Sequence, residues 1–280
     1  MKKETMIGLI AIAVTASAVL FAGCVKKDEA PPVEARQLTT PTAKDEAPPV
    51  EAKQLTTHTA DDGEADWSPD GNKIAFMSER TGNDDIWAMD SDGGNQRQLT
   101  THATYDGFPD WSPDGNKIAF TSERAGNLDI WVMDCDGSNQ RQLTTHTADD
   151  GKADWSPDGN KIAFMSDRGG NFDIWVMDSD GINQKQLTTH TADDADANWS
   201  PDSKKIAFES KRAGNVDIWV MDSDGRNQKQ LTMHTADDLG ADWSPDGNKI
   251  AFASKRTGNF DIWVLIPWEV DDGVEYYYRL

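Results

Sequence analysis

The sequence predicts an all-β fold: a five-bladed β-propeller with four antiparallel strands per blade, closed by an N-terminal outer strand in the last blade. A block of 44 residues occurs five times, and the phrase Trp-Ser-Pro-Asp begins at Trp67, Trp111, Trp155, Trp199 and Trp243. The pattern of apolar residues is broken into short segments, and no apolar stripe at helical spacing is present. Short strands that carry two tryptophans per block cannot bury their faces alone, so the repeats must stack around an axis.

The first block predicts four strands joined by three turns. We expect strands at Ala65–Ser68, Lys73–Ser78, Asp85–Met89 and Gln96–Thr100. Pro69-Asp70-Gly71-Asn72 favours a hairpin turn, because Pro presets φ, Asp bonds its own backbone and Gly accepts a positive φ. Further turns are expected at residues 80–83 and 90–93.

The ends of the repeat array predict how the ring closes. The fifth block has three strands, at Ala241–Ser244, Lys249–Ser254 and Phe260–Leu265, and then no Gln-Leu-Thr phrase. An unmatched Gln54-Leu55-Thr56 precedes the first block. The sequence therefore predicts that this N-terminal segment supplies the missing outer strand and removes the unpaired sheet edge.

The segments outside the repeats predict export and anchoring. Residues 1–23 are typical of a lipoprotein signal peptide, since Lys2 and Lys3 precede an uncharged stretch from Met6 to Gly23, and Cys24 is then the lipidated residue. An uncleaved membrane span over the same stretch is the alternative. Residues 24–51 are expected to be a flexible tether, residues 52–268 the propeller and residues 269–280 a C-terminal tail.

The composition excludes some partners. The chain has 280 residues, a net charge of -22 and a pI near 4.4, which disfavours binding to nucleic acid. The two cysteines do not indicate a disulfide framework. No nucleophile elbow, phosphate loop or zinc motif occurs, so catalysis is not expected.

The repeat resembles that of a known family. The unit Trp-Ser-Pro-Asp-Gly-Asn-Lys-Ile-Ala-Phe, followed by Ser-x-Arg-x-Gly-Asn-x-Asp-Ile-Trp-Val-Met-Asp and Gln-Leu-Thr, closely resembles the WD-repeat-like propeller repeat of the TolB family from Lys53 to about Val264. The resemblance implies a periplasmic or cell-surface scaffold that binds partners at a propeller face. TolB itself carries an additional N-terminal domain and typically six blades, whereas five repeats are counted here, so the Tol–Pal role does not carry over.

Five histidines lie in the loops between successive blades and admit two interpretations. As a rim of imidazoles they are candidate metal ligands, and some TolB-like propellers are similar to metal-dependent lyases that act on acidic sugars. We favour a structural role, in which His58, Ser78, Asp85 and Trp87 form a hydrogen-bonded network like that of WD-repeat blades. The histidines concerned are His58, His102, His146, His190 and His234.

Aspartates immediately before the first tryptophan of a blade are expected to face the axis or the next blade. These are Asp66, Asp110, Asp154 and Asp242, with Asn198 in the fourth blade. A divalent cation in or near the channel would relieve their repulsion, but we favour carboxylates that accept backbone N–H groups and pin a loop. The Asp-x-Asp-Gly turns, such as Asp90 and Asp92, match calcium loops poorly and are interpreted as side-chain-capped turns on an acidic face.

One position differs in every blade and is the strongest candidate for function. It is occupied by Glu64, Phe108, Lys152, Asp196 and Gly240, and a shared structural demand cannot require all five side chains. We expect them at the channel mouth on the histidine-bearing face, with Tyr105, Phe108 and Pro109 as an aromatic anchor for a partner. The alternative is neutral drift on an exposed loop.

The sequence therefore predicts a monomeric, lipid-anchored, extracytoplasmic propeller, periplasmic or at the cell surface, which binds a protein or peptide of the cell envelope and is not an enzyme. The alternatives are a metal-dependent polysaccharide lyase or hydrolase, and a purely structural surface repeat protein.

Overall fold

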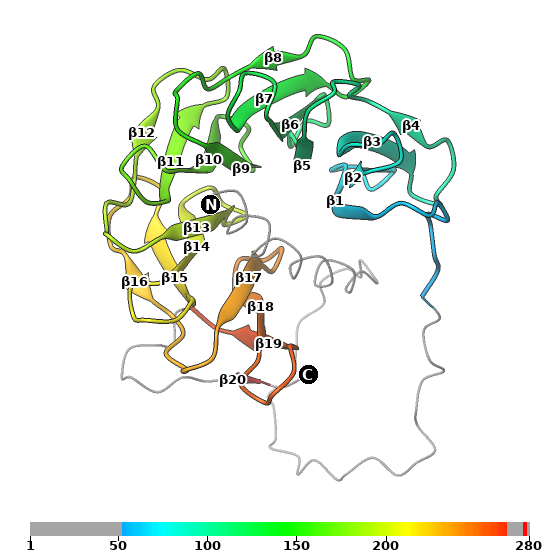
Figure 1. Cartoon of the computed structure of the whole chain (residues 1–280). Coiled ribbons are helices and arrows are strands. Elements are labelled where there is room, and N and C mark those ends of the chain that lie inside the picture. The colour runs from blue at the N-terminus through cyan, green and yellow to red at the C-terminus, as the bar shows by residue number, and fades with distance from the viewer. Residues whose placement is uncertain (1–51, 268–276, 279–280) are drawn as a thin grey trace, which may run out of the picture.

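Five four-stranded antiparallel sheets follow one another around a central axis, with the first strand of each sheet innermost (Figure 1). The structure is a computed structural model that describes residues 52–267 and 277–278. In this part of the chain the regular elements are strands, and no helix is long and apolar enough to cross a membrane. The predicted five-bladed propeller is confirmed.

Each blade takes its strands in chain order from the axis outward. Blade one contains β1 (Asp62–Trp67), β2 (Lys73–Ser78), β3 (Asp85–Asp90) and β4 (Arg97–Gln98). Blade two contains β5 (Asp106–Trp111), β6 (Lys117–Ser122), β7 (Asp129–Asp134) and β8 (Arg141–Gln142). Blade three contains β9 (Asp150–Trp155), β10 (Lys161–Ser166), β11 (Asp173–Asp178) and β12 (Lys185–Gln186). Blade four contains β13 (Asp194–Trp199), β14 (Lys205–Ser210), β15 (Asp217–Asp222) and β16 (Lys229–Gln230). Blade five contains β17 (Asp238–Trp243), β18 (Ile250–Ser254), β19 (Asp261–Leu265) and β20 (Tyr277–Tyr278).

The innermost strand begins earlier than the sequence predicts, because it contains a β-bulge. Asp62 and Gly63 pair with Ser78 and Met77, and the pairing resumes at Asp66 with Ala75, which leaves one extra residue on β1. Glu64 in this bulge has a φ of 49°, in the left-handed region. The predicted strand Ala65–Ser68 was therefore wrong at its start, since the bulge interrupts the alternation that marks a strand.

The first turn forms as its sequence predicts. The Gly71 N–H donates to the Ser68 carbonyl over 2.8 Å, and Gly71 has a φ of 70°. The Asp70 carboxylate accepts the Ser68 hydroxyl at 2.7 Å and the Asn72 N–H at 3.1 Å. Serine, aspartate and glycine thus each serve the tight reversal between β1 and β2.

The core lies between blades rather than inside them. At the junction of blades two and three, Ile130 and Val132 of one sheet pack against Trp155, Ile162 and Phe164 of the next. The junctions between blades three and four and between four and five repeat this packing with the equivalent residues. Because each sheet buries its apolar face against a neighbour, a single blade has no core of its own.

A buried ion pair ties the inner strand to the rest of each blade. In blade four, Arg212 Nη2 lies 2.5 Å from Asp194 Oδ2, and Nη1 donates to Gln228 Oε1 at 2.6 Å. The Arg212 guanidinium lies 4.9 Å from the ring centroid of Trp219. The equivalent arginines of the other blades are Arg80, Arg124, Arg168 and Arg256.

The predicted closure by an N-terminal strand was wrong. Blade five takes its outer strand from the C-terminal end of the chain, where Tyr277 and Tyr278 pair with Leu265 and Val264. These two residues therefore belong to the propeller and not to a tail. Leu55 instead packs against blade one, where its carbonyl accepts Gln96 Nε2 at 3.1 Å. The same Gln-Leu-Thr phrase follows each complete blade and contacts the next one, so the unmatched copy contacts the blade that comes after it.

Cys24, the stretch from Met6 to Gly23 and nearly all of the predicted tether lie outside the described residues. Their assignment as signal, lipidation site and tether stays a prediction.

Candidate functional site

The variable position is the bulge residue of each innermost strand, so the five side chains share one backbone conformation. Their φ values lie between 49° and 64°: Glu64, Phe108, Lys152, Asp196 and Gly240. We call these five residues the rim. Each lies near the start of its strand, at the end reached from the histidine-bearing loop. Their predicted role at the channel mouth stays a prediction. A left-handed conformation is costly for residues other than glycine, so the bulge is held by the surrounding blade.

Rim residues of neighbouring blades contact each other across the inner strands. Lys152 Nζ lies 2.8 Å from Asp196 Oδ1 and 5.5 Å from the centroid of the Phe108 ring. Blades two, three and four thus contribute an aromatic ring, an ammonium and a carboxylate to one cluster. Variation that looks unrelated in the sequence produces complementary neighbours.

Glu209 on β14 completes the cluster. Its Oε1 accepts the backbone N–H of Gly240 at 2.7 Å, and its carboxyl shares a hydrogen bond with Asp196. Burial and the Asp196 charge raise the pKa of Glu209, whereas Lys152 overcomes the burial of Asp196 and lowers its pKa. The cluster therefore holds a Lys152–Asp196 ion pair beside a carboxyl group that retains its proton near neutral pH.

The aromatic residues of blade two lie close together, and their role as an anchor for a partner stays a prediction. The rings of Tyr105 and Phe108 lie 6.5 Å apart between centroids, tilted by 54°. Both side chains are half-buried, and burial raises the pKa of the Tyr105 hydroxyl. Pro109 is buried. The loop side of blade two thus offers apolar surface next to the charged cluster.

Glu64 is the rim carboxyl poised to titrate near neutral pH. Burial raises its pKa to about 7, an effect that Lys152 opposes and Asp196 reinforces. Its ordinary pKa of 4.5 applies to the unfolded chain. The folded state therefore prefers protonated Glu64, and stability is lost as the pH rises from 4.5 towards 7.

Replacing Glu64 with glutamine is expected to remove this pH dependence. At pH 8 the variant should gain about 1–3 kcal/mol in free energy of unfolding, and at pH 4 it should match the parent protein. Urea unfolding at the two pH values measures the difference. An equal effect at both pH values would show that ionisation of Glu64 has no part in it.

The predicted aspartates link the inner strands of successive blades. The Oδ2 atoms of Asp66, Asp110 and Asp154 accept the backbone N–H groups of Trp111, Trp155 and Trp199 at 2.7, 2.7 and 2.8 Å. Burial and neighbouring aspartates raise the pKa of Asp110. The backbone-accepting role is as we expected, but the bond reaches the next blade's strand rather than a loop.

The histidines cap their own loops, and the predicted WD-repeat-like network is wrong. His146 Nδ1 accepts the backbone N–H of Ala148 at 3.0 Å, and His58, His102, His190 and His234 make equivalent bonds. The Asp85 carboxylate is bonded instead by Thr81, Gln98 and Thr100. Threonine and glutamine of the outer segment reach Asp85, so the imidazole is not needed there.

No three His, Cys, Asp or Glu side chains within residues 52–267 are grouped as ligands for one metal ion. In this part of the chain the structure therefore does not bring the five histidines and the aspartates together as ligands of one ion. Asp242, the fourth predicted aspartate, is exposed on β17.

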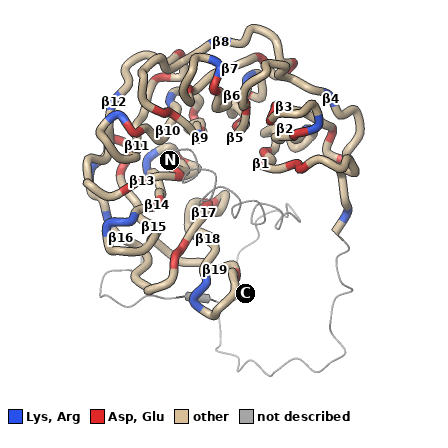
Figure 2. The backbone as a smooth tube through the Cα atoms, in the orientation of Figure 1, with Lys and Arg blue, Asp and Glu red and all other residues tan. Residues whose placement is uncertain are grey.

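The opposite face carries the capped turns and is acidic, as predicted. Asp92 Oδ1 accepts the Gly94 N–H at 2.9 Å, and Asp90 binds Lys73 Nζ at 2.8 Å. The Ser91 N–H donates to the Asn72 carbonyl over 2.9 Å, which places the two kinds of turn side by side. Figure 2 shows acidic positions recurring in every blade, along inner strands as well as turns.

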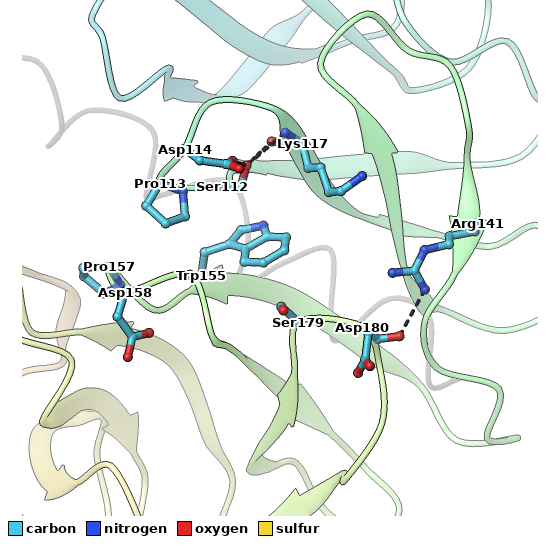
Figure 3. Close-up of a pocket in the computed structure, with 11 residues that line it drawn as sticks. Ser112, Pro113, Asp114, Lys117, Arg141, Trp155, Pro157, Asp158, Ser179 and Asp180 are labelled. Carbon is cyan, nitrogen blue, oxygen red and sulfur yellow. Dashed lines mark hydrogen bonds between the residues drawn. The ribbon is translucent and has the colours of Figure 1, made fainter.

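A pocket of about 560 Å³ lies on this opposite face between blades two and three (Figure 3). Trp155 lies between two Ser-Pro-Asp turns, and Arg141 Nη1 donates to the Asp180 carbonyl at 3.0 Å. Trp155 and the Ser-Pro-Asp turns recur in every blade, and the position of Arg141 is arginine or lysine in each of the first four blades. The pocket is therefore part of the scaffold and less informative about a specific ligand than the rim.

Sequence reasoning missed Glu209 and the buried arginine pairs. Glu209 occupies a position that is Met77, Thr121, Met165 and Ala253 in the other blades, so the comparison that found the rim could have found it. The arginines are identical in all blades and carry no such signal.

Residues 101–203 match the family model of the TolB beta propeller domain. Residues 170–275 also match the model of the Tricorn protease N-terminal beta propeller domain. No curated protein sequence matches the chain.

Solved structures support the same assignment. The chain is similar to TolB from Acinetobacter baumannii, with 27% identity, a TM-score of 0.69 and coverage of 78% of this chain and 55% of that one. A putative TolB from Agrobacterium tumefaciens is 24% identical, with a TM-score of 0.67 and coverage of 80% and 82%. An oligogalacturonate lyase in complex with manganese is 16% identical, with a TM-score of 0.58 and coverage of 72% and 61%. The chain thus spans little more than half the length of the Acinetobacter protein, and its likeness to the lyase concerns the fold alone.

Proposed function

We propose that this protein is an extracytoplasmic, membrane-anchored propeller that binds a protein or peptide segment at its rim and is not an enzyme. The main support for the proposal is that the bulge position combines a constant backbone with variable side chains. The five blades keep one backbone conformation there and place five different side chains on it. Selection for folding alone favours glycine at such a φ, and only blade five has it.

The chemistry of the rim supports recognition of a polypeptide. Phe108 and Tyr105 offer aromatic surface, and the Lys152–Asp196 pair beside them offers fixed charge of both signs. Aromatic side chains in partly buried sites are frequent anchors of protein interfaces. The net charge of -22 favours a partner segment that carries basic residues.

Location and anchoring form the second part of the proposal. Similarity to TolB structures supports a partner in the cell envelope, and the pattern at residues 2–24 supports a lipid anchor on Cys24. The polysaccharide lyase alternative has only the shared fold in its favour.

Replacing both Glu64 and Phe108 with glycine tests the rim. Glycine relieves the left-handed strain at both positions, so the variant should fold at least as well as the parent. Recovery of the partner from native envelope extracts is expected to fall at least about tenfold. The matched control is Ser203→Gly, a left-handed residue with a φ of 59° in a turn of the opposite face, where the four other blades have glycine at φ near 70°. Recovery of the same partners by the rim variant and the control would contradict the proposal.

A further inference from the structure

Blade one exposes a tryptophan that the other blades bury. The Trp67 side chain is 47% exposed, whereas Trp111, Trp155, Trp199 and Trp243 are 6–8% exposed. The same Ser-Pro-Asp sequence follows each of these five residues. The difference must therefore come from what lies beside each blade.

Inside the chain, each such tryptophan is covered by the preceding blade. Trp155 packs with Ala119, Ile130 and Val132 of blade two, together with Leu143 from the segment that follows it. Among the described residues, the corresponding cluster on blade one consists of Ile74, Phe76 and Met89 with Leu55 and Trp87, and blade five contributes none of them. Half of an interblade interface is thus present without its partner.

Blade five exposes the other half. Ile262 is 42% exposed, whereas Ile86, Ile130, Ile174 and Ile218 of the other blades are each 0% exposed. Ala251 and Val264 on the same face are half-buried. Figure 1 shows β1 and β19 on opposite sides of the opening in the ring.

The two exposed faces are complementary, because the chain forms this interface four times within itself. Ala251, Ile262 and Val264 occupy the repeat positions of Ala119, Ile130 and Val132. One component is missing from blade five: the leucine of the Gln-Leu-Thr phrase that ends each of the other blades. The sequence after β19 departs from the repeat at Ile266-Pro267 and has no such phrase. Blade one already holds Leu55 in that place: Gln96 Nε2 donates to its carbonyl at 3.1 Å, as Gln140 Nε2 does to Leu99 at 3.0 Å.

We propose that a second copy of this chain occupies the open face, with blade five of one copy packed on blade one of the next. Trp67 of one copy would lie against Ile262 of the other, and Leu55 would complete the cluster. The contact is head-to-tail, so each copy keeps one free face and association continues with concentration. This proposal departs from the monomer that the sequence suggests, and it does not depend on the proposed rim function.

Two single variants and their mixture test the proposal. Each of Trp67→Asp and Ile262→Asp places a charge on one face only, at a position already exposed to solvent. Sedimentation equilibrium of the full protein in mild detergent should show mass rising with concentration for the parent and monomers for each variant alone. An equimolar mixture should form a one-to-one dimer, because the Trp67→Asp copy retains an intact blade-five face and the Ile262→Asp copy an intact blade-one face.

The controls separate association from folding. Ile182→Asp changes another exposed isoleucine, 58% exposed and away from both faces, and should associate like the parent. The double variant should remain monomeric in every mixture. If circular dichroism reveals unfolding of an aspartate variant, the serine pair Trp67→Ser and Ile262→Ser replaces it. A monomeric parent at all concentrations, or a mixture that fails to dimerise, would overturn the proposal.

Discussion

Replacing Lys152 with methionine is expected to lower the free energy of unfolding by about 2–4 kcal/mol at pH 8. The change removes the cation that lies 2.8 Å from Asp196 and leaves Asp196 and Glu209 beside each other. Lys152 lowers the pKa of Asp196, so its stabilising effect is present above pH 3.8 and is lost as the pH falls. The loss in the variant should therefore shrink towards pH 4, where the carboxyl groups take up protons.

Urea unfolding of matched variants measures this effect. Lys161→Met in the same blade removes an exposed pair, in which Lys161 is 44% exposed, and should cost less than about 1 kcal/mol. The double variant Lys152→Met with Asp196→Asn should recover most of the stability, since no unpaired charge remains. Equal losses for Lys152→Met and Lys161→Met would mean that the rim cluster is solvated rather than buried.

Replacing Arg212 with alanine is expected to cost about 3–5 kcal/mol. The Asp194 side chain is 0% exposed and Arg212 is 11% exposed, so the change leaves a buried carboxylate without its cation. The guanidinium also packs 5.5 Å from the ring centroid of Phe208 and 4.9 Å from that of Trp219, and this packing is lost too.

The neighbouring residue supplies the control for this prediction. Lys211 pairs with Asp193 at 3.1 Å, but both side chains are 39% exposed. Lys211→Ala should therefore cost below about 1 kcal/mol in the same denaturant titration. Lys211 and Arg212 are adjacent in the sequence, and so are their partners Asp193 and Asp194. The two ion pairs therefore provide a comparison of an exposed pair with a buried one. Similar losses at both positions would contradict the account.

The rim illustrates how far residue patterns lead towards a site. Comparison of the five blades within one chain identified the position of Lys152 and Asp196 and the end of the blade on which it lies. It could not predict that Lys152 contacts both Phe108 and Asp196, because that depends on the angle between blades. Glu209 lies on a different strand, and only the bulge brings Gly240 within 2.7 Å of it.

The histidines show the opposite case. Their identical spacing suggested a shared network with Asp85, but the hydrogen-bond donors that the imidazoles accept from are local. His146 bonds a backbone N–H two residues away, whereas Asp85 is satisfied by Thr81, Gln98 and Thr100. A repeat places equivalent residues in equivalent positions and does not say which neighbour each one bonds.

The sequence by itself determined the number of blades, the four strands of each and the positions of the turns, since these follow from local alternation and turn chemistry repeated five times. Only the tertiary structure decided which end supplies the last outer strand and whether the first and last blades meet. Those outcomes depend on packing between distant segments: Leu55 contacts blade one, Tyr277 and Tyr278 pair with β19, and Trp67 and Ile262 remain uncovered. Identical repeat sequences cannot encode that difference, because it arises from the rotation between neighbouring blades summed over the whole ring.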